Sequence, residues 1–374
     1  MKIFMCVNYP QYNKAIGISK KISMQINTFK KLGFDVYYSV YLEDGVAICH
    51  DGQIIQKQIF RNLKMHRVLR RFRLLNLCIE YLENNTFSLG FVRWDPVDRL
   101  FLKVLLYLDK QCDKVIMDFH GYFPGYSGKG IKRIYTKYTT KLNGKKMAKY
   151  VDLGFVELKR SKVFGIKTLP IDTCIDVDNY EPHSYQLSRN EINMISVSNE
   201  TIYHGYDRII NGIANYINSR GEVPVTLHLV GNMTQKTIAL IKKLNLNKYV
   251  KLYGYKTGSE LTQIYNMCNI GVGPLAPHRV GGKEGTGIKT KEYFAIGLPY
   301  VYAGNELLVP NDFKYAYKIV ANDIPVRIEE IAYFYNSIKN DKGIEENMRD
   351  FARAHYSCEK AFQTALNELQ FFGE

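Results

Sequence analysis

The sequence predicts an α/β protein with two doubly wound parallel sheets, one in each half of the chain. Two observations carry this prediction. A length of 374 residues suits about two domains. Short apolar runs of strand type alternate with amphipathic helical patterns, and the alternation starts again after residues 167–185, a stretch that contains Pro170, Pro182 and several Asp residues. Such alternation is typical of parallel sheets covered by helices, so we interpret this stretch as the linker between two Rossmann-like domains.

The first half opens on a βαβ unit. The apolar run at residues 2–7 predicts a buried strand, and residues 19–32 have the spacing of a helix that ends before Gly33. Further strands are predicted at residues 35–40, 89–92 and 114–119. We expect this first domain to span residues 1–170.

The second half repeats the scheme. We predict strands at residues 193–197, 225–230, 249–253, 270–272 and 300–303, with helices at residues 208–219, 234–244, 259–267 and 286–296. We expect this domain to span residues 186–343, and we expect the amphipathic segment 344–374 to cross back onto the N-terminal domain. The two domains should face each other across a cleft that holds the ligand at the carboxyl ends of both sheets.

The composition excludes several classes of protein. No run approaches the roughly 20 apolar residues that span a bilayer, and the first residues lack the pattern of a signal peptide. The seven cysteines are odd in number, far apart and without a C-x-x-C pair. This argues against a disulfide framework or a structural zinc site, and it favours a cytoplasmic location.

The net charge of +15 is concentrated in the first half. Residues 1–180 hold 30 of the 51 Lys and Arg residues and 16 of the 36 Asp and Glu residues, a balance of +14 that leaves +1 for the rest. A uniformly basic surface is therefore excluded, and the basic half requires its own explanation.

The most informative stretch is glycine-rich and spans residues 281–299. It leads into a predicted helix, whose N-terminal N–H groups and dipole form an anion site that suits a diphosphate. Lys289 lies in the first helical turn, where it can pair with phosphate. Glu284 precedes the turn, and Glu292 follows about two helical turns later, where it can accept hydrogen bonds from a ribose diol. Glycines alone would equally suit a simple helix cap, but the two glutamates at this spacing favour a nucleotide-sugar site.

Three matches then point to one family. The two glutamates, followed by residues 293–299, resemble the nucleotide-sugar site of retaining GT-B glycosyltransferases of the group 1 family. Residues 203–212 and the pair His278-Arg279 resemble segments of the bacterial capsule, exopolysaccharide and O-antigen transferases in that family. The resemblance covers nearly the whole chain, strongly at residues 193–303 and weakly at 40–110. It implies a GT-B fold, a UDP-hexose donor, a lipid-linked or oligosaccharide acceptor, and neither a cofactor nor a metal ion.

The resemblance also implies roles for individual residues. Glu284 would bind sugar hydroxyls on the face where the glycosidic bond changes, and His120 would face the donor sugar. The residues expected to bind the donor are Gly17, Asn199, His204, Arg208, Arg279, Gly285, Thr286, Gly287, Lys289 and Glu292. Many relatives carry an Arg and a Lys in the loop that corresponds to residues 198–205, whereas this chain has no Arg there and His204 stands near the Lys place.

Two basic segments account for much of the excess charge. They run from Arg61 to Arg73 and from Lys129 to Lys149, and both have apolar residues at helical spacing. A basic amphipathic helix can lie on anionic lipid, although each segment alone would equally suit a helix packed on the core. Together with the lipid-linked acceptors that the resemblance implies, the two segments predict a peripheral protein at the inner face of a bacterial plasma membrane.

Three alternatives remain open at this stage. An inverting transferase and a UDP-sugar epimerase would share the GT-B fold. A non-enzymatic nucleic-acid-binding protein would explain the charge of +15, but the sequence has no recognisable nucleic-acid-binding motif, and the two glutamates would remain unexplained.

Overall fold

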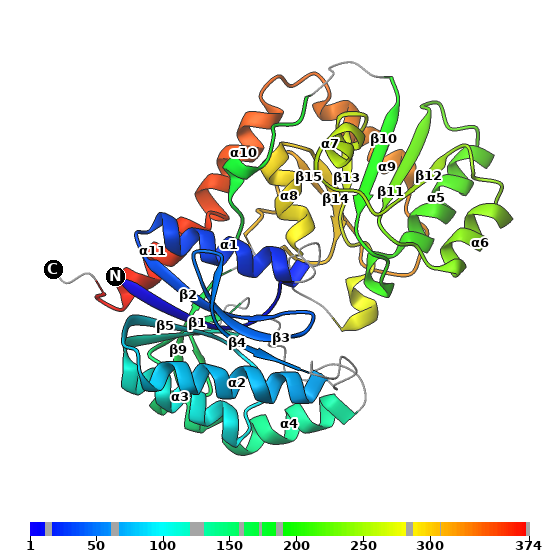
Figure 1. Ribbon diagram of the computed structural model, residues 1–374. Coiled ribbons are helices and arrows are strands. Elements are labelled where there is room, and N and C mark those ends of the chain that lie inside the picture. The colour runs from blue at the N-terminus through cyan, green and yellow to red at the C-terminus, as the bar shows by residue number, and fades with distance from the viewer. Residues whose placement is uncertain are drawn as a thin grey trace. The chain divides into compact units, whose positions relative to one another are not determined.

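A computed structural model describes residues 1–11, 17–60, 67–119, 131–156, 161–171, 174–184, 190–281, 287–306 and 308–371. The chain divides into two compact units. Unit 1 comprises residues 1–172 and 358–374, and unit 2 comprises residues 173–357. Each unit contains a largely parallel sheet with helices on both faces (Figure 1), which confirms the predicted α/β class with two Rossmann-like units.

The sheet of unit 1 has the strand order β4-β3-β2-β1-β5-β6-β7-β9-β8. Its strands are β1 (Lys2–Pro10), β2 (Asp35–Tyr41), β3 (Gly45–His50), β4 (Gln53–Ile59), β5 (Phe87–Arg93), β6 (Cys112–Asp118), β7 (Leu153–Val156), β8 (Lys162–Val163) and β9 (Ile166–Pro170). The order β2-β1-β5-β6-β7-β9 is parallel throughout. This is the arrangement that βαβ connections produce.

Both edges of this sheet differ from the predicted all-parallel arrangement, and at one of them β8 pairs antiparallel with β9. At the other edge, strands β2, β3 and β4 pair antiparallel. Asp51 and Gly52 join β3 to β4 with φ values of +47° and +80°, which suit the two-residue Asp-Gly turn of a hairpin. The sequence signal was present in this dipeptide, but the prediction did not use it.

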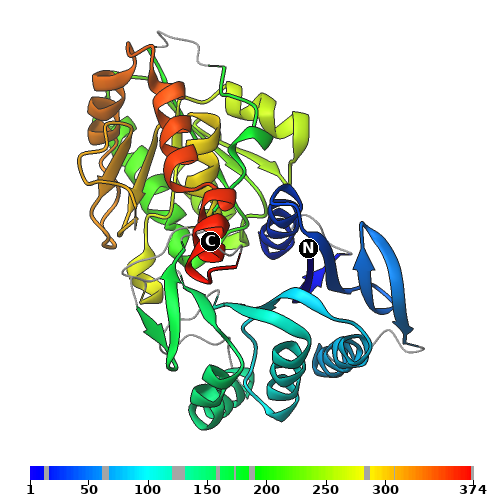
Figure 2. The ribbon, with the colours of Figure 1, turned by 90° about the vertical axis from the view of Figure 1, so that its left-hand side faces the viewer.

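Helices cover both faces of the unit 1 sheet. They are α1 (Gly17–Lys31), α2 (Arg67–Glu83), α3 (Arg99–Gln111), α4 (Ile131–Asn143), the 3-10 turn η1 (Gly144–Lys149) and α11 (Cys358–Glu368). Helices α2, α3 and α4 lie on one face, and α1 and α11 lie on the other (Figures 1 and 2). Phe29, Phe91 and Phe362 pack together on the second face, with ring centroids 4.7–6.2 Å apart.

Unit 2 has a parallel sheet with the order β12-β11-β10-β13-β14-β15. Its strands are β10 (Ile192–Val197), β11 (Val225–Val230), β12 (Val250–Gly254), β13 (Ile270–Val272), β14 (Tyr300–Ala303) and β15 (Ala316–Ile319). Its helices are α5 (Tyr206–Asn218), α6 (Gln235–Lys243), α7 (Gly258–Asn266), α8 (Ile288–Ile296), α9 (Ile328–Ile338) and α10 (Ile344–His355), with the 3-10 turns η2 (Val177–Asn179), η3 (Ile202–His204) and η4 (Pro277–Val280). Chain order reverses between β10 and β13, so these neighbouring strands form the topological switch point where open α/β sheets bind ligands.

The C-terminal segment is divided differently from the prediction. Residues 344–374 were expected to form one segment on the N-terminal domain, whereas α10 belongs to unit 2 and α11 to unit 1. Within unit 2, Arg349 of α10 donates a hydrogen bond to the Tyr180 carbonyl (3.1 Å) and another to the Ala295 carbonyl of α8, which explains why α10 stays with this unit. Cys6, Cys49, Cys78, Cys112 and Cys268 are free and buried. Among the described helices, none is long and apolar enough to cross a bilayer.

Candidate nucleotide-sugar site

The predicted site residues fall into two groups. Glu284, Gly285, Thr286 and His120 lie outside the described residues, and Gly17 is described as the first residue of α1. Asn199, His204, Arg208, Arg279, Gly287, Lys289 and Glu292 are described, and all belong to unit 2. The geometry of the site therefore comes from unit 2.

Lys289 lies beneath the switch point of the unit 2 sheet. Its Nζ donates to Ser196 Oγ of β10 (2.8 Å) and to the Val272 carbonyl of β13 (3.4 Å), so it bridges the two strands where chain order reverses. The ammonium also lies 5.9 Å from the ring centroid of Tyr206. The side chain is buried, and all three of these neighbours are neutral.

Burial lowers the pKa of Lys289 from 10.5 to about 7, and the charge of Glu292 opposes this shift. A buried ammonium without a hydrogen-bonded carboxylate is costly because its desolvation is not compensated. An anionic ligand at the switch point would supply the missing counter-charge. Lys289 is therefore the described residue whose position best fits a diphosphate.

Serine and tyrosine hydroxyls extend from Lys289 towards the loop after β10. Ser196 Oγ donates to the Val272 carbonyl (3.0 Å) and lies 3.0 Å from the Tyr206 hydroxyl, which in turn lies 2.5 Å from Ser198 Oγ. These partners satisfy the buried hydroxyls without using Lys289. The sequence analysis missed this network, although serines at alternate positions near the end of a strand point to the same face.

His204, which stands near the Lys place of many relatives, is a neutral hydrogen-bond donor in this structure. Its Nδ1 accepts a hydrogen bond from the Thr201 N–H (3.0 Å), so the proton of the neutral ring lies on Nε2. Burial and the nearby Lys289 charge lower the pKa of His204 to about 2. His204 cannot replace the positive charge that many relatives carry in this loop.

Asn199 lies at the exposed tip of the loop after β10. Its Oδ1 accepts from the Asn232 N–H (3.0 Å), while the neighbouring Glu200 accepts from the Thr234 N–H (2.7 Å) at the start of α6. Gly231 has φ of +119°, and a Cβ there would lie 2.3 Å from the Ser198 carbonyl oxygen. A side chain at this position would therefore push the two loops apart.

Arg208 is used within the protein. Its guanidinium is buried and donates to the carbonyls of Leu275, Val320 and Ile324 and to Asn322 Oδ1. These contacts join the end of β13 to the segment after β15. The donor-binding role predicted for Arg208 does not fit this arrangement, because its N–H groups are directed at protein acceptors.

Arg279 is also engaged with protein partners. It forms a bidentate pair with Asp207 (2.7 and 2.8 Å), and its Nε donates to Asp323 (2.6 Å). These carboxylates raise the pKa of Arg279, and they neutralise its charge locally. The donor-binding role predicted for Arg279 would require these pairs to break.

Replacement of Arg279 tests that role. We expect Arg279→Ala to change the affinity for a UDP-sugar by less than about threefold. The free energy of unfolding should fall by only about 1 kcal/mol, because ion pairs to substantially exposed carboxylates contribute little to stability. Calorimetric titration and chemical denaturation measure the two effects. A tenfold or larger loss of affinity in a normally folded variant would return Arg279 to the donor site.

Glu292 lies on α8 and is buried. Its carboxylate accepts a hydrogen bond from the Tyr180 hydroxyl (3.2 Å), and burial together with the Glu292 charge raises the pKa of Tyr180. Sequence reasoning missed Tyr180, because residues 167–185 were interpreted only as a linker. A ribose diol that binds Glu292 would either share this carboxylate with the Tyr180 hydroxyl or displace the Tyr180 hydroxyl from it.

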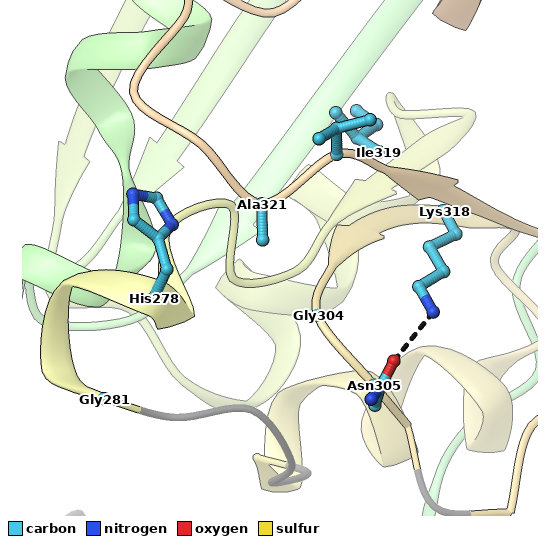
Figure 3. A pocket seen from close by; sticks show the side chains of 8 residues that line it. His278, Gly281, Gly304, Asn305, Lys318, Ile319 and Ala321 are labelled. Carbon is cyan, nitrogen blue, oxygen red and sulfur yellow. Dashed lines mark hydrogen bonds between the residues drawn. The ribbon is translucent and has the colours of Figure 1, made fainter.

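A cavity of about 630 Å³ lies beyond the switch point, at the carboxyl ends of β14 and β15. His278 lines one side, and Lys318 with Asn305 lines the other (Figure 3). Lys318 Nζ donates to Asn305 Oδ1 (2.8 Å). The cavity also borders Gly281, the first residue of the glycine-rich stretch.

One group of possible metal ligands lies in unit 1. The ligand atoms of Asp35, His50 and Asp51 are all within 4.8 Å of one another. Lys30 already pairs with Asp51 (2.8 Å), and His50 pairs with Asp35. Because these groups already neutralise one another, we do not assign a metal to them.

The sequence of unit 2 is similar to a known protein family. Residues 192–312, from β10 to the loop after β14, match the family model described as glycosyl transferases group 1. This segment is therefore similar to the group 1 glycosyltransferases. It contains Lys289, Glu292 and the glycine-rich stretch, so the sequence match and the switch point coincide. No curated protein is significantly similar to the chain.

Solved structures match the whole chain at the level of the fold. Sucrose-phosphate synthase from Thermosynechococcus elongatus has 15% identity and a TM-score of 0.67, with coverage of 100% of this chain and 99% of that one. A glycosyltransferase from Rickettsia africae has 14% identity and a TM-score of 0.69, with coverage of 99% and 97%. HepE of Anabaena, solved in complex with UDP, has 14% identity and a TM-score of 0.62, with coverage of 99% and 100%. These likenesses confirm the GT-B fold around the segment that is similar to the group 1 family.

Proposed function

We propose that this chain is a retaining hexosyltransferase that moves a sugar from a UDP-hexose onto a lipid-linked or oligosaccharide acceptor during the synthesis of a bacterial surface polysaccharide. One observation carries the proposal. The buried Lys289, which has only neutral partners in the described structure, lies at the switch point of a domain that is similar to the group 1 glycosyltransferases. The UDP and UDP-glucose complexes of the structurally similar HepE support a uridine diphosphate donor.

In the proposed reaction, the bond between the anomeric carbon and the β-phosphate oxygen breaks, and UDP leaves. Lys289 and the N-terminal amides of α8 would stabilise the charge that develops on the diphosphate. The acceptor hydroxyl forms the new bond to the anomeric carbon on the face that UDP leaves, and its proton is released. Glu284 and His120 are assigned to the donor sugar, and Asn199, His204, Gly285, Thr286, Gly287 and Glu292 to the rest of the donor. The proposal includes no metal ion.

The stereochemistry of the product separates the proposal from its GT-B rivals. We expect the enzyme to release UDP and to form a glycoside with the anomeric configuration of the donor, in the presence of EDTA as in its absence. Proton NMR of the product reports this configuration. An inverted anomeric centre would identify an inverting transferase, and release of UDP with an epimerised free sugar would identify an epimerase.

A nucleic-acid-binding role remains the rival from another class. Its support is the positive charge of the first half, which the similarity of unit 2 to the group 1 family does not explain. A gel shift that weakens with salt, together with an absence of UDP binding, would favour it.

A further inference from the structure

Helix α4 of unit 1 presents its apolar residues to solvent. Ile134, Tyr138 and Leu142 are 69%, 63% and 56% exposed, and Tyr135 is also exposed. These residues follow helical spacing, so they form one continuous stripe. A helix of a soluble protein normally directs such a stripe towards the core.

Among the side chains of α4 that the structure describes, residues 134–143, the inner face consists of small polar residues. Thr136 and Thr139 are only 4% and 7% exposed, and the Thr139 hydroxyl returns a hydrogen bond to the Tyr135 carbonyl of its own helix (2.9 Å). The helix is therefore inverted, with threonines inside and Ile, Tyr and Leu outside. An exposed stripe of this kind marks a surface that another apolar phase covers.

The charge around the stripe is of one sign. Residues 131–149, which form α4 and η1, contain seven basic residues and no acidic residue; the basic ones are Lys132, Arg133, Lys137, Lys141, Lys145, Lys146 and Lys149. Lys137 and Lys141 are exposed on α4, and Lys145, Lys146 and Lys149 are exposed on η1. This charge favours an anionic partner and opposes the pairing of α4 with α4 of a second copy.

Helix α2, the other basic segment of the sequence, is built differently. Leu74, Leu75, Cys78 and Leu82 are buried in the core of unit 1. Arg71 pairs internally with Asp95 and with Asp98 (2.6 Å), the residue that caps α3. The interpretation as a helix packed on the core, which the sequence left open, therefore holds for α2 but not for α4.

We infer that α4 and η1 lie in the interface of an anionic membrane, with Ile134, Tyr138 and Leu142 inserted among the acyl chains and the lysines at the headgroups. This deepens the proposed function, because it rests on the membrane location of a transferase that uses a lipid-linked acceptor. It also differs from the sequence-based expectation, since it assigns the contact to α4 and not to α2. Tyrosine suits this interface because its ring is apolar and its hydroxyl is polar.

Flotation with vesicles of phosphatidylcholine, with and without phosphatidylglycerol, tests this inference. We expect the full chain to float with the anionic vesicles and to lose binding as salt is raised. Ile134→Ser/Leu142→Ser should reduce binding at least tenfold. Two matched pairs serve as controls: Leu69→Ser/Phe72→Ser on α2 and Ile54→Ser/Ile59→Ser on β4, all of which replace exposed apolar residues of unit 1. Both should float like the wild type.

The outcomes separate this inference from the proposed function. Flotation of the α4 variant at the wild-type level, or an equal loss in the α2 pair, would overturn the assignment to α4. If the chain bound neutral vesicles as strongly as anionic ones, the role of the lysines would be overturned. If the wild type formed concentration-dependent dimers that dissociate in the α4 variant, the exposed stripe would instead bind a second copy of the chain. UDP binding, measured on each variant, shows that unit 2 is folded; its absence in the wild type would refute the proposed function alone.

Discussion

Lys289→Met is expected to lower the affinity for a UDP-sugar by about 10- to 100-fold, because a charge-assisted contact to phosphate contributes roughly 1.5–3 kcal/mol. The substitution leaves the apo structure well satisfied. Ser196 Oγ keeps its contacts with the Val272 carbonyl and the Tyr206 hydroxyl, and the Val272 carbonyl also accepts from Tyr293. Isothermal titration calorimetry measures the affinity. Lys318→Met, which removes an exposed lysine from the neighbouring cavity, is the control and should change it by less than twofold.

The same substitution is expected to stabilise the apo protein at neutral pH. Folding lowers the pKa of Lys289 from 10.5 to about 7, so the folded chain holds this proton less tightly than the unfolded chain does. The resulting destabilisation is absent above pH 10.5, grows as the pH falls and is complete below pH 7. Chemical denaturation should therefore show a larger gain for Lys289→Met at pH 6.5 than at pH 9.5. A loss of stability that does not depend on pH would contradict the account of Lys289 as a buried, uncompensated ammonium.

Donor affinity should carry the matching pH dependence. A diphosphate binds protonated Lys289 more tightly, so the affinity should fall as the pH rises from 7 to 9, while Lys289→Met should show no such fall. An intact UDP-sugar is the better probe, because it lacks a terminal phosphate monoester. The terminal phosphate of free UDP titrates at about pH 6 and would add its own pH dependence. A wild-type affinity that stays constant from pH 7 to 9 would show that Lys289 does not meet the donor.

Glu284→Ala is expected to reduce kcat by about 10²- to 10³-fold, the usual effect of removing one group that acts mainly in the transition state. The substitution should change the affinity for UDP by less than threefold, since Glu284 is assigned to the sugar and not to the diphosphate. Steady-state release of UDP measures kcat, and Glu222→Ala, at an exposed site in the same unit, is the control. A Glu284→Ala enzyme with near wild-type kcat would refute the assignment.

The sequence predicted the parallel strands and helices of unit 2 well, because short apolar runs and helical periodicity alternate there without interruption. It was less informative where tertiary contacts decide the outcome. Arg208 is a basic residue beside a candidate phosphate loop, and only the folded chain shows that its N–H groups meet the Leu275, Val320 and Ile324 carbonyls. His204 presented the same difficulty, since its neutrality depends on its burial and on the nearby Lys289 charge, and only the folded chain shows these.

Helical spacing alone could not distinguish the two basic segments either. Both place apolar residues on one stripe, but periodicity does not state whether the stripe faces the core or solvent. The structure distinguishes them: α2 buries the apolar Leu74 and Leu75, whereas α4 buries Thr136 and Thr139 and exposes its apolar stripe. Threonines at the positions opposite an apolar stripe are the signal that could have predicted the inverted helix.

Titration of UDP into the wild type and into Lys289→Met at pH 7.5 tests most directly whether unit 2 binds a uridine diphosphate through Lys289. We expect saturable binding at one site per chain, at least tenfold weaker in Lys289→Met, and we expect that variant to be no less stable than the wild type. Equal affinity in the two proteins, or no saturable binding of UDP to the folded wild type, would contradict this expectation.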